Sequence, residues 1–415
     1  MSNINDKIRQ IAKETEPELI HIRRELHQYP ELGIDLPKTH EIISRELHKI
    51  PGLKIREHAA GGYGLIAELK GKKEHGKNVL LRADIDALPL EEKVESTYKS
   101  RHDGRMHACG HDMHTAMLLG AAKLLKAHED ELEGTVKLMF QPAEEIFEGS
   151  RDMIQAGLLQ NPDVDGALMI HVMAGMPFEA GTVIVSAPGV SAPAADYFEI
   201  SVQGTGCHGS MPYAGVDPLN AAAHILIALQ EIHARELAMD DRAVLTFGTM
   251  NAGTAANVIP DMAVMAGSIR TFDEEIRALI KERMVQIADG IARSFRAEAN
   301  VSFGSGCPTL VNDKDLCICT ERYVKELLGG HKAFSVSDRN AMSAGQKPSK
   351  SAGSEDFAYV SQEVPSIMLA LAAGQPEKGY GYPQHHPMVR FDEDALVNGS
   401  AVYAYTAMRW LEEHK

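Results

Sequence analysis

The residues best suited to metal chemistry lie between His107 and His114. This run reads His-Ala-Cys-Gly-His-Asp-Met-His, which places a thiol and several imidazoles within a few positions. Thiolate and imidazole groups are the ligands that zinc and similar ions take in proteins. Gly110 separates Cys109 from His111 and lets the backbone turn, so that both side chains can reach one centre. A buried cysteine beside surface histidines would give the same run. The other candidate ligands in the chain must therefore decide between this structure and a metal site.

A second group is the pair Glu144 and Glu145, which follows the apolar run Thr135–Phe140. Pro142 stops the pairing of that strand, and adjacent side chains beyond it can point in different directions. One carboxylate can then bind a metal ion while its neighbour accepts a proton from water. For an isolated pair of glutamates, a solvated acidic turn is the more common structure.

Further candidate ligands also follow apolar runs. His171 comes directly after the run GALMI, and the doubled His385-His386 stands just before the last predicted helix. A lone histidine on an apolar strand is usually a core residue. The prediction of a metal site therefore rests on the whole set, because cysteine, histidine and glutamate all fall just after predicted buried strands.

Two acidic residues, Asp84 and Asp86, follow the run NVLLR in the same way. Side chains two positions apart on an extended segment lie on the same face. Such carboxylates are suited to orienting metal ligands and raising their basicity, rather than to binding the metal themselves.

A third polar group lies in the middle of the chain. His208 stands between glycines in the run GTGCHG, and Asn257 and Arg270 follow at wider spacing. His208 could donate a hydrogen bond to an oxyanion, or it could be an ordinary loop residue. The sequence contains no nucleophile elbow and no phosphate-binding glycine loop, so serine hydrolase and nucleotide-binding functions are disfavoured.

Strand and helix patterns alternate in the first half of the chain, as expected for a scaffold that places residues at strand ends. Apolar strand-like runs alternate there with helical patterns: strands at Leu65–Lys70, Asn78–Arg82, Thr135–Phe140 and Gly166–Val172, helices at Thr115–Ala127 and near Gly149–Ala156. This order is typical of a doubly wound α/β layer, in which catalytic groups collect where strands end.

The pattern changes near Ser186–Pro193, a stretch of small residues and proline that is typical of a hinge. The following segment predicts a small α+β domain with strands at Tyr197–Gln203, Ala243–Met250 and Met262–Thr271, and helices at Asp217–Arg235 and Glu274–Phe295. The chain then resumes with helices at Lys314–Leu328 and Asp392–Glu413 and a strand at Ser366–Leu371. We therefore predict a catalytic domain in two halves, residues 1–188 and 303–415, interrupted by an inserted domain, residues 189–302.

Composition narrows the classes of function. The 415 residues include 42 Lys and Arg against 58 Asp and Glu, which gives a formal net charge of −16 and argues against nucleic acid as a partner. Five scattered cysteines, an odd number, predict a reducing compartment rather than a disulfide framework. Since the chain shows neither a signal peptide nor an apolar run of membrane-spanning length, we expect a soluble cytoplasmic protein with no membrane partner.

Eight motifs occur in an order that resembles one known family. They are RRELHQYPELG, LRADIDALPL, MHACGHDMHTAMLLGAA, FQPAEE, GCHGSMPYAGVDPLNAA, NVIPD, SEDF and HHP, and they extend over most of the chain. They resemble the dinuclear-metal amidohydrolases that include hippurate hydrolase, N-acetyldiaminopimelate deacetylase and the plant indoleacetyl-amino-acid hydrolases, within the aminoacylase and carboxypeptidase clan of metallopeptidases. The resemblance implies an α/β catalytic domain, with a mixed sheet flanked by helices, and an inserted α+β domain for dimerisation that acts as a lid.

The resemblance also implies roles for single residues. Two divalent ions per subunit, of zinc, manganese, cobalt or nickel, would be held by five ligands: Cys109, His111, Glu145, His171 and His385. Cys109 would bridge the two ions. Glu144 would be the general base, and Asp84 would orient the site from behind. In the inserted domain His208 would stabilise the oxyanion, often in the partner subunit's site, and Asn257 and Arg270 would bind or place the substrate carboxylate.

The expected activity is hydrolysis of the amide bond of N-acyl-amino acids, such as N-acetyl or N-benzoyl conjugates, in a homodimer or possibly a tetramer. A dipeptidase or carboxypeptidase of the same clan is the alternative enzyme, and a non-catalytic metal-containing binding protein is the alternative from another class. The sequence departs from the family pattern at Gln384, where leucine is usual, and at Cys207, where glycine is usual. The doubled histidine leaves both His385 and His386 open as the last ligand, with His385 favoured. Cys307, Cys317 and Cys319 have no assigned chemistry.

Overall fold

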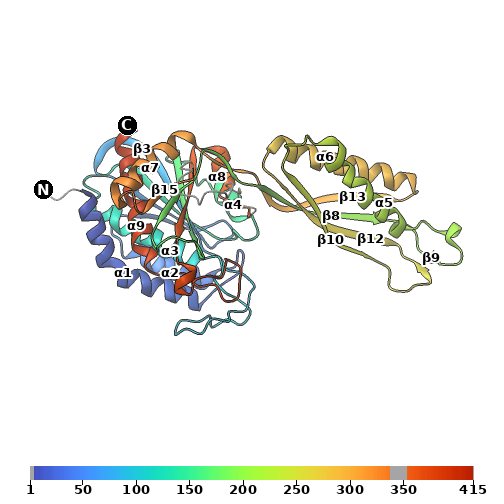
Figure 1. Cartoon of the computed structure of the whole chain (residues 1–415), viewed down its shortest axis with the longest axis horizontal. Helices are drawn as coiled ribbons and strands as arrows, with labels where there is room; N and C mark the ends of the chain where they lie inside the picture. The colour runs from blue at the N-terminus through green and yellow to red at the C-terminus, as the bar shows by residue number, and fades with distance from the viewer. Residues whose placement is uncertain (1–3, 337–352, 415) are drawn as a thin grey trace. The chain divides into compact units, whose positions relative to one another are not determined.

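The computed structural model describes residues 4–336 and 353–414, and its chain divides into two compact units (Figure 1). The first unit contains the chain up to Ser191 and most of the chain from Val311 onwards. The second unit contains Ala192–Leu310 and the short segment that ends at Glu355. The sequence pattern places the boundaries at 188 and 302 instead. The later boundary differs because strand β13 (Glu298–Cys307) continues to pair with β8 (Ala194–Gln203) as far as Cys307.

The first unit is built on an eight-stranded mixed sheet with the order β1-β2-β4-β3-β5-β16-β6-β15. Its strands are β1 (Lys54–Ala59), β2 (Gly64–Lys70), β3 (Lys73–Asp84), β4 (Glu133–Gln141), β5 (Gly166–Met173), β6 (Val183–Val185), β15 (Ala333–Ser335) and β16 (Ser366–Ala372). The central strands β4, β3, β5 and β16 run parallel, while β1 and β2 pair antiparallel. Central parallel strands are buried on both faces, which explains their continuous apolar runs. The predicted α/β fold with a mixed sheet is confirmed.

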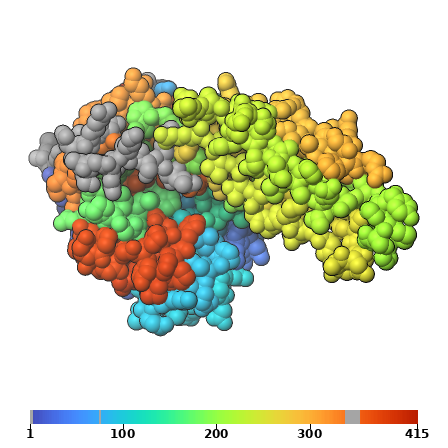
Figure 2. Space-filling view, turned by 45° about the vertical axis from the view of Figure 1, so that its right-hand side comes forward, coloured from blue at the N-terminus to red at the C-terminus, as the bar shows by residue number. Residues whose placement is uncertain are grey.

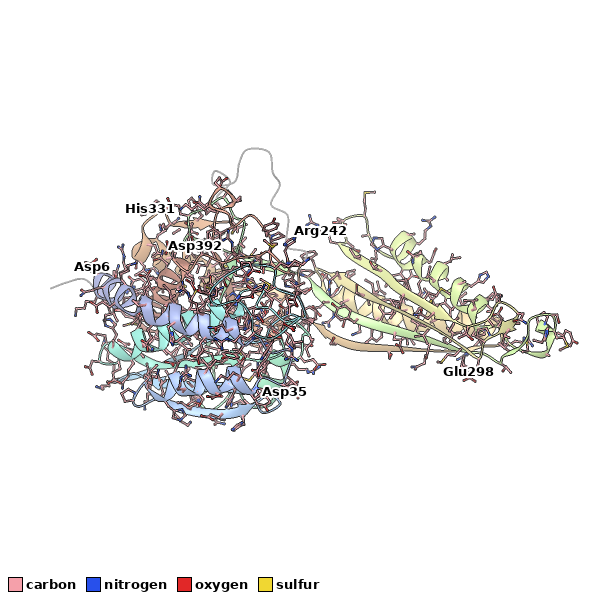
Figure 3. All side chains as sticks on the ribbon, turned by 90° about the horizontal axis from the view of Figure 1, so that it is seen from below. Asp6, Asp35, Arg242, Glu298, His331 and Asp392 are labelled. Atoms are coloured by element: carbon pink, nitrogen blue, oxygen red, sulfur yellow. The ribbon has the colours of Figure 1, made fainter. Side chains whose placement is uncertain are left out.

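Helices cover this sheet and account for most of the remaining core. They are α1 (Ile4–Gln28), α2 (Pro37–His48), α3 (His111–Ala127), α4 (Gly149–Gln155), α7 (Lys314–Leu328), α8 (Ala358–Glu363) and α9 (Ala395–Glu413). Helices α1, α3 and α9 pack on one another, and α3 and α9 also pack on β3. Figure 3 labels Asp6 in the first turn of α1 and Asp392 just before α9. No helix within residues 4–336 or 353–414 is both long enough and apolar enough to cross a membrane.

Helix α3 begins at His111, four residues before the predicted start at Thr115. The polar residues His111, Asp112 and His114 interrupt the apolar periodicity from which the start was predicted. All three are nevertheless buried. The first turn of α3 therefore carries polar side chains in the interior, where each must find a polar partner or a ligand.

The second unit is a four-stranded antiparallel sheet with the order β10-β12-β8-β13 and two helices packed on it. Its further elements are β10 (Ala243–Ala252), β12 (Met262–Thr271), α5 (Pro218–Glu231), α6 (Glu274–Ser294) and a ribbon of β9 (Cys207–His208) with β11 (Val258–Ile259). Asp217 and Asp273 cap α5 and α6 by accepting backbone N–H bonds in the first turn. Strand β10 is an edge strand of this sheet. Buried and exposed residues alternate along β8, which explains why this strand could be predicted from the alternation of apolar and polar residues in the sequence.

A buried ion cluster joins the carboxyl ends of β3 and β4. Arg82 donates to Asp84 at 2.7 Å and to Asp356 at 3.0 Å, and these three side chains are 0% exposed. Asp356 also accepts from the side-chain amide of Gln141 at 2.6 Å and from the backbone N–H of Ser150 at 2.9 Å. The cluster thus fixes the strand end that precedes Pro142 and Glu144.

We expect Asp356→Ala to lower the free energy of unfolding by about 3–5 kcal/mol, because it leaves a buried guanidinium with half of its carboxylate charge. Denaturant and thermal unfolding of the variant and the wild type measure this loss. Asp103→Ala, at an exposed position, is the matched control and should change stability little. Equal stability of Asp356→Ala and the wild type would show that the cluster contributes no net stabilisation.

Candidate metal centre

Cys109 and His111 flank the glycine at the start of α3. Gly110 has φ +98°, in the left-handed region, and a Cβ atom there would lie 2.4 Å from Cγ2 of Val172. Only glycine fits this turn, which places the thiol and the imidazole toward one centre. Cys109 is buried, and its Sγ lies 3.5 Å from Nε2 of His171.

The hydrogen bonds of His111 fix its tautomer. Its Nδ1 lies 2.9 Å from the backbone carbonyl oxygen of Asp86, which can only accept, so Nδ1 carries the proton. In the neutral ring, the form that binds a metal, Nε2 therefore keeps its lone pair, and this atom is buried without a hydrogen-bond partner. It lies 3.9 Å from Oε1 of Glu145 and 3.5 Å from Oδ2 of Asp84. A buried lone pair that faces carboxylate oxygens is suited to a cation between them.

His171 and His114 differ in whether a ring nitrogen remains available to bind a metal ion. His171 donates from Nδ1 to its neighbour's carbonyl, Val172 O, at 2.7 Å, which leaves Nε2 free to face Cys109. His114 donates from Nδ1 to Asp84 at 2.6 Å and accepts at Nε2 from the backbone N–H of Val172 at 2.8 Å. Because both nitrogens of His114 are engaged, this residue positions α3 against β5 and is not a ligand candidate.

The turn after β4 directs its two glutamates into the protein. Ala143 has φ +57°, a strained conformation for a residue with a side chain, and its N–H donates to Gly33 O at 2.9 Å. The backbone N–H of Glu145 donates to Oδ2 of Asp86 at 3.1 Å, and Oε1 of Glu145 is buried without a hydrogen-bond partner. Glu144 is only 5% exposed. The pair is therefore not a solvated acidic turn.

The loop before α9 carries His385 toward the same centre. His385 has φ +62°, its N–H donates to Ala108 O at 3.0 Å, and its Nε2 lies 3.6 Å from Oε1 of Glu145. His386 instead stacks on Tyr382, with ring centroids 4.5 Å apart, and accepts at Nδ1 from a backbone N–H. Gln384, the departure from the family pattern, donates to Val172 O at 2.9 Å and so ties the loop to β5.

The surface view shows the neighbourhood of this loop. In Figure 2 the red segment near residue 385 lies beside the light-blue segment near residue 95, and Lys93 N–H donates to Pro387 O at 2.9 Å. The side chain of His385 is 54% exposed, the most exposed of the five predicted ligands whose side chains lie here. The centre of the first unit is therefore open to solvent on the side of His385.

Together these side chains fit a metal centre. Candidate ligand atoms within 4.8 Å of one another form overlapping groups: Cys109, His111 and His171; Cys109, Glu145 and His385; His111, Glu144 and Glu145. The overlap at Cys109 is what a ligand shared between two ions requires. The unpartnered Nε2 of His111 and Oε1 of Glu145 are the observation that supports a cation here, because buried polar atoms without partners are costly.

The pKa shifts at the centre also favour a bound cation. Burial raises the pKa of the Cys109 thiol well above its usual range, and burial raises the pKa of Glu145 to about 7. Burial lowers the pKa of His171 to about 3, so its imidazole is neutral. Thiol and carboxyl groups that retain protons in this environment lose them when a divalent cation compensates the charge, and a neutral imidazole is ready to bind one.

Asp84 and Asp86 contact opposite nitrogens of the same ring, that of His111. Burial alone would raise the pKa of Asp84, but the charge of Arg82 and the hydrogen bond from His114 oppose it, and the pKa is held well below its usual range. Asp86 lies 3.2 Å from Nδ1 of His111 and also accepts from Glu145 N. The sequence pattern indicates that both Asp84 and Asp86 orient metal ligands, but it assigns no role to His114. The alternation in ADIDAL and the i,i+3 spacing of His111 and His114 are the signals that indicate them.

The remaining predicted residues belong to the second unit. His208 on β9 pairs with Val258 on β11, directly after Asn257, and Gly209 N–H donates to Asn257 O at 2.8 Å. Nδ1 of His208 accepts from the backbone N–H of Ser210 at 3.1 Å, so the proton of the neutral ring is on Nε2, and the residue is exposed. The imidazole is thus a ready hydrogen-bond donor.

Arg270 lies at the other end of this unit. Met262 pairs with Gln203 at the end of the sheet next to the β9–β11 ribbon, whereas Arg270 pairs with Ala195 near the opposite end. Eight residues of extended strand separate Met262 from Arg270, a length of about 26 Å. The second unit therefore brings His208 and Asn257 together and keeps Arg270 apart from them.

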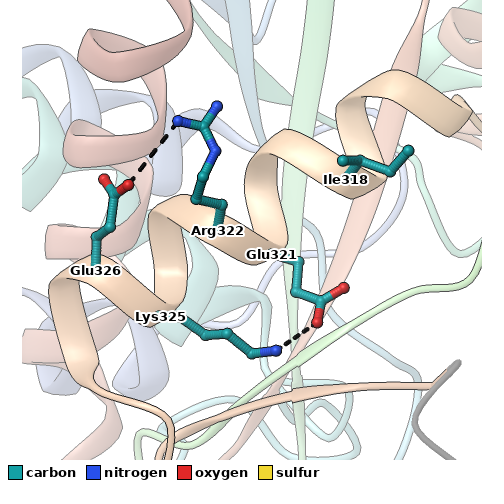
Figure 4. Close-up of a pocket in the computed structure, with 5 residues that line it drawn as sticks. All are labelled: Ile318, Glu321, Arg322, Lys325 and Glu326. Carbon is teal, nitrogen blue, oxygen red and sulfur yellow. Dashed lines mark hydrogen bonds and ion pairs between the residues drawn. The ribbon is translucent and has the colours of Figure 1, made fainter.

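A surface hollow on α7 is unrelated to this chemistry. Figure 4 shows its lining residues, Ile318, Glu321, Arg322, Lys325 and Glu326. Lys325 pairs with Glu321 at 2.5 Å, and Arg322 lies 3.9 Å from Glu326. These are ordinary i,i+4 ion pairs of an exposed helix face, and no candidate ligand lines the hollow.

Comparison with known sequences gives consistent matches along the chain. The model of peptidase family M20/M25/M40 matches residues 80–409. N-acetyl-L-cysteine deacetylase of Bacillus subtilis (strain 168) is 38% identical over 401 residues, which cover 96% of this chain and 90% of that protein. IAA-amino acid hydrolase ILR1-like 2 of Arabidopsis thaliana is 37% identical over 420 residues, which cover 99% of this chain and 90% of that protein.

A solved structure matches both units. The YXEP protein of Bacillus subtilis, described as a dinuclear metal binding peptidase from the M20 family, has a TM-score of 0.76 and is 33% identical. The match covers 96% of this chain and 99% of that chain. The resemblance expected from the eight sequence motifs is confirmed. The structure places four of the motifs, those that carry candidate ligands or the acidic pair behind them, around one centre, together with His171.

Proposed function

Because the chain belongs to peptidase family M20/M25/M40, we propose that it hydrolyses the amide bond of N-acyl-amino acids. Membership makes the protein a metal-dependent hydrolase of amide bonds, and two divalent ions are its cofactors. The observation that carries the proposal is the buried Glu144 next to Glu145, inside the group of ligand atoms. A protein that only bound its ligand would need no buried base at this position.

The names of the two relatives support the class of substrate. One is a deacetylase of N-acetyl-L-cysteine and the other is a hydrolase of IAA-amino acid conjugates. Each name describes an amide bond between an acyl group and an amino acid. We therefore assign N-acyl-amino acids as the substrate class of this chain, without choosing the acyl group.

The proposed mechanism assigns a role to each part of the site. When bound, divalent ions would supply polarisation of the scissile carbonyl and would make water a stronger acid. Glu144 accepts a proton from the attacking water and transfers it to the leaving nitrogen. Cys109, His111, Glu145, His171 and His385 would hold the ions. Asp86 orients the ring of His111, and Asp84, which is bound to His114 and Arg82, orients the site from behind. His208 donates its Nε2–H to the oxygen that becomes negative in the transition state.

The separation within the second unit supports a shared active site. About 26 Å of strand lies between the ends that carry Arg270 and the β9–β11 ribbon, which is longer than an N-acyl-amino acid. His208 and Arg270 of one chain cannot both contact the same substrate molecule. If both act, we propose that His208 and Asn257 serve one site and that Arg270 serves another, each completed by a partner subunit.

The surface of the second unit supports a homodimer formed through it. Among the described residues, ten of the thirteen exposed large hydrophobic side chains belong to this unit. They include Ile227 on α5, which is 67% exposed, and Val244 on the edge strand β10, which is 53% exposed. An uncovered edge strand with apolar side chains is a favourable surface for pairing with a second copy.

Mixing two inactive variants tests the shared site. We expect Glu144→Gln and His208→Ala each to have very low activity alone, because one lacks the base and the other lacks the oxyanion donor. After subunit exchange in equal amounts, half of the dimers are mixed and one of their two sites is intact, so about one quarter of wild-type activity returns. If no activity returns although subunits exchange, His208 does not act in a partner's site.

A panel of substrates tests the proposed function itself. N-acetyl-, N-benzoyl- and indoleacetyl-amino acids and dipeptides would be assayed after chelation and reloading with Zn²⁺, Mn²⁺, Co²⁺ or Ni²⁺. We expect N-acyl-amino acids to have the highest kcat/KM, and chelation to abolish turnover until a metal is restored. Higher kcat/KM for dipeptides would instead support a peptidase, the alternative favoured by the description of the YXEP protein.

We propose zinc or manganese as the native metal and a reducing compartment, the cytoplasm, as the location. A thiolate ligand favours Zn²⁺, whereas mixed oxygen, nitrogen and sulfur ligands also accept Mn²⁺, Co²⁺ or Ni²⁺. The five cysteines are free thiols, and Cys109 must stay free to bind a metal. Metal analysis of protein purified without added metal addresses the first point.

A further inference from the structure

A second group of metal-ligating side chains lies on the first unit, outside the catalytic centre. His40 on α2 and Glu57 and His58 on β1 have ligand atoms that all lie within 4.8 Å of one another. Figure 3 labels Asp35, which lies just before α2. The three side chains range from buried to exposed, at 9%, 30% and 69% for His40, Glu57 and His58.

Both histidines of this group present the same nitrogen. Nδ1 of His40 lies 3.0 Å from Tyr63 O, and Nδ1 of His58 lies 2.8 Å from Gly62 O. A backbone carbonyl can only accept, so each Nδ1 carries the proton and each Nε2 keeps a lone pair. A backbone carbonyl that fixes the tautomer in this way is the usual outer partner of a metal-binding histidine.

The two lone pairs face one carboxylate oxygen. Oε2 of Glu57 lies 3.4 Å from Nε2 of His40 and 3.9 Å from Nε2 of His58, while its Oε1 accepts from the hydroxyl of Ser44 at 2.7 Å. Three acceptors that face one another repel unless a positive charge lies between them. One divalent cation can bind all three atoms, which lie within 4.8 Å of one another, and the two rings stack with centroids 4.9 Å apart.

The backbone of β1 is shaped to make this arrangement. The register of β1 with β2 shifts between Arg56 and Ala59, which is a β-bulge, and Glu57 and His58 are the residues within it. His58 has φ +60°, in the left-handed region that residues with a side chain seldom adopt. Bulges re-aim side chains and often occur at functional positions. Here the bulge directs two consecutive side chains toward His40.

We propose that His40, Glu57 and His58 bind a Zn²⁺ ion at the surface of the first unit. Zinc takes imidazole and carboxylate ligands at about 2.0–2.2 Å in a tetrahedron, whose edges are then about 3.3–3.6 Å. The separation of 3.4 Å between Glu57 Oε2 and His40 Nε2 matches this edge, and the separation of 3.9 Å between Glu57 Oε2 and His58 Nε2 is slightly longer than it. Water supplies the fourth ligand.

Bound zinc would connect α2 to the bulge of β1. The site does not use any residue of the catalytic centre, so its occupancy is independent of amide hydrolysis. Its effect is to hold the turn between β1 and β2, which contains Tyr63 and Gly62, against the helix. Because only the folded chain brings these three ligands together, zinc binding would raise the thermal stability of the first unit.

Zinc stoichiometry tests the proposal. Untagged holoenzyme and its variants would be dialysed against the same low-micromolar free Zn²⁺ and analysed for metal per chain. We expect His58→Asn and Glu57→Gln each to bind one zinc fewer than the wild type, with unchanged turnover. His48→Asn is the matched control, because Nδ1 of His48 is engaged with Ser44 O at 2.9 Å and lies 3.7 Å from Glu57.

The same measurement can overturn the proposal. Equal zinc content in the wild type, His58→Asn and Glu57→Gln would exclude the site, and loss of zinc in His48→Asn alone would exclude this ligand set. His58 is exposed, so its variant is expected to fold, and an unchanged circular dichroism spectrum checks this. The result does not depend on which substrate the enzyme hydrolyses, so it separates this proposal from the proposed function.

Discussion

We expect Glu144→Gln to lower kcat by about 10²- to 10⁴-fold, while the metal content stays that of the wild type. The amide keeps the shape of the side chain in its buried position, but it cannot accept a proton from water or deliver one to the leaving nitrogen. Glu144 is 5% exposed, so bulk water cannot easily take over this role. Steady-state kinetics with an N-acyl-amino acid, together with metal analysis of the same sample, measure both parts of this result.

The control for this variant lies in the same turn. Glu148→Gln changes a half-buried glutamate that belongs to none of the ligand groups described above, and its turnover should stay within a few-fold of the wild type. Near-normal turnover of Glu144→Gln would exclude Glu144 as the base. Loss of metal from this variant would instead identify Glu144 as a ligand and leave the base unassigned.

We expect Cys109→Ala to lose metal as well as activity, because Cys109 belongs to two of the three ligand groups described at the centre. Loss of a ligand shared by two ions weakens both of them, and we expect activity to fall by about 10³-fold or more. Catalytic metal per chain, measured after dialysis against metal-free buffer, should fall from two ions toward none. This differs from Glu144→Gln, in which metal is retained.

Cys207→Ala is the matched control for the cysteine. Cys207 is a half-buried residue of the second unit, and its thiol lies 3.5 Å from Met211 O. Its variant should keep the metal and most of the activity. Full metal occupancy in Cys109→Ala would mean that the thiolate is not a ligand and that the two ions are held by the other side chains.

Most of the side chains that meet at the centre of the first unit could be predicted from local patterns, because their positions follow from where strands end. The apolar runs before Asp84, Glu144 and His171 form β3, β4 and β5, which are buried parallel strands whose ends lie at one edge of the sheet. The glycine between Cys109 and His111 could be predicted to turn the chain, and its φ of +98° agrees. Local pattern thus carries most of the information about which side chains meet.

What the sequence could not provide are the orientations that depend on distant parts of the chain. The free nitrogen of His111 is set by the carbonyl of Asp86, and the choice between His385 and His386 is set by contacts with Ala108 and Tyr382. The proposed zinc site on α2 and β1 could not be predicted from the sequence, because His40 and Glu57 are 17 residues apart and meet only through a bulge. Such contacts follow from tertiary packing, which periodicity does not encode.

The bond between Arg82 and Asp356 has a consequence for synthesis of the protein on the ribosome. The two residues are 274 positions apart, and the second unit lies between them as one almost continuous stretch of chain. Domains fold largely as units during translation. The second unit can therefore complete its fold while the first half of the other unit still lacks β16, Asp356 and His385. Until then Arg82 has only one of its two carboxylate partners, Asp84. The candidate metal ligands become a complete set only as the last segment leaves the ribosome.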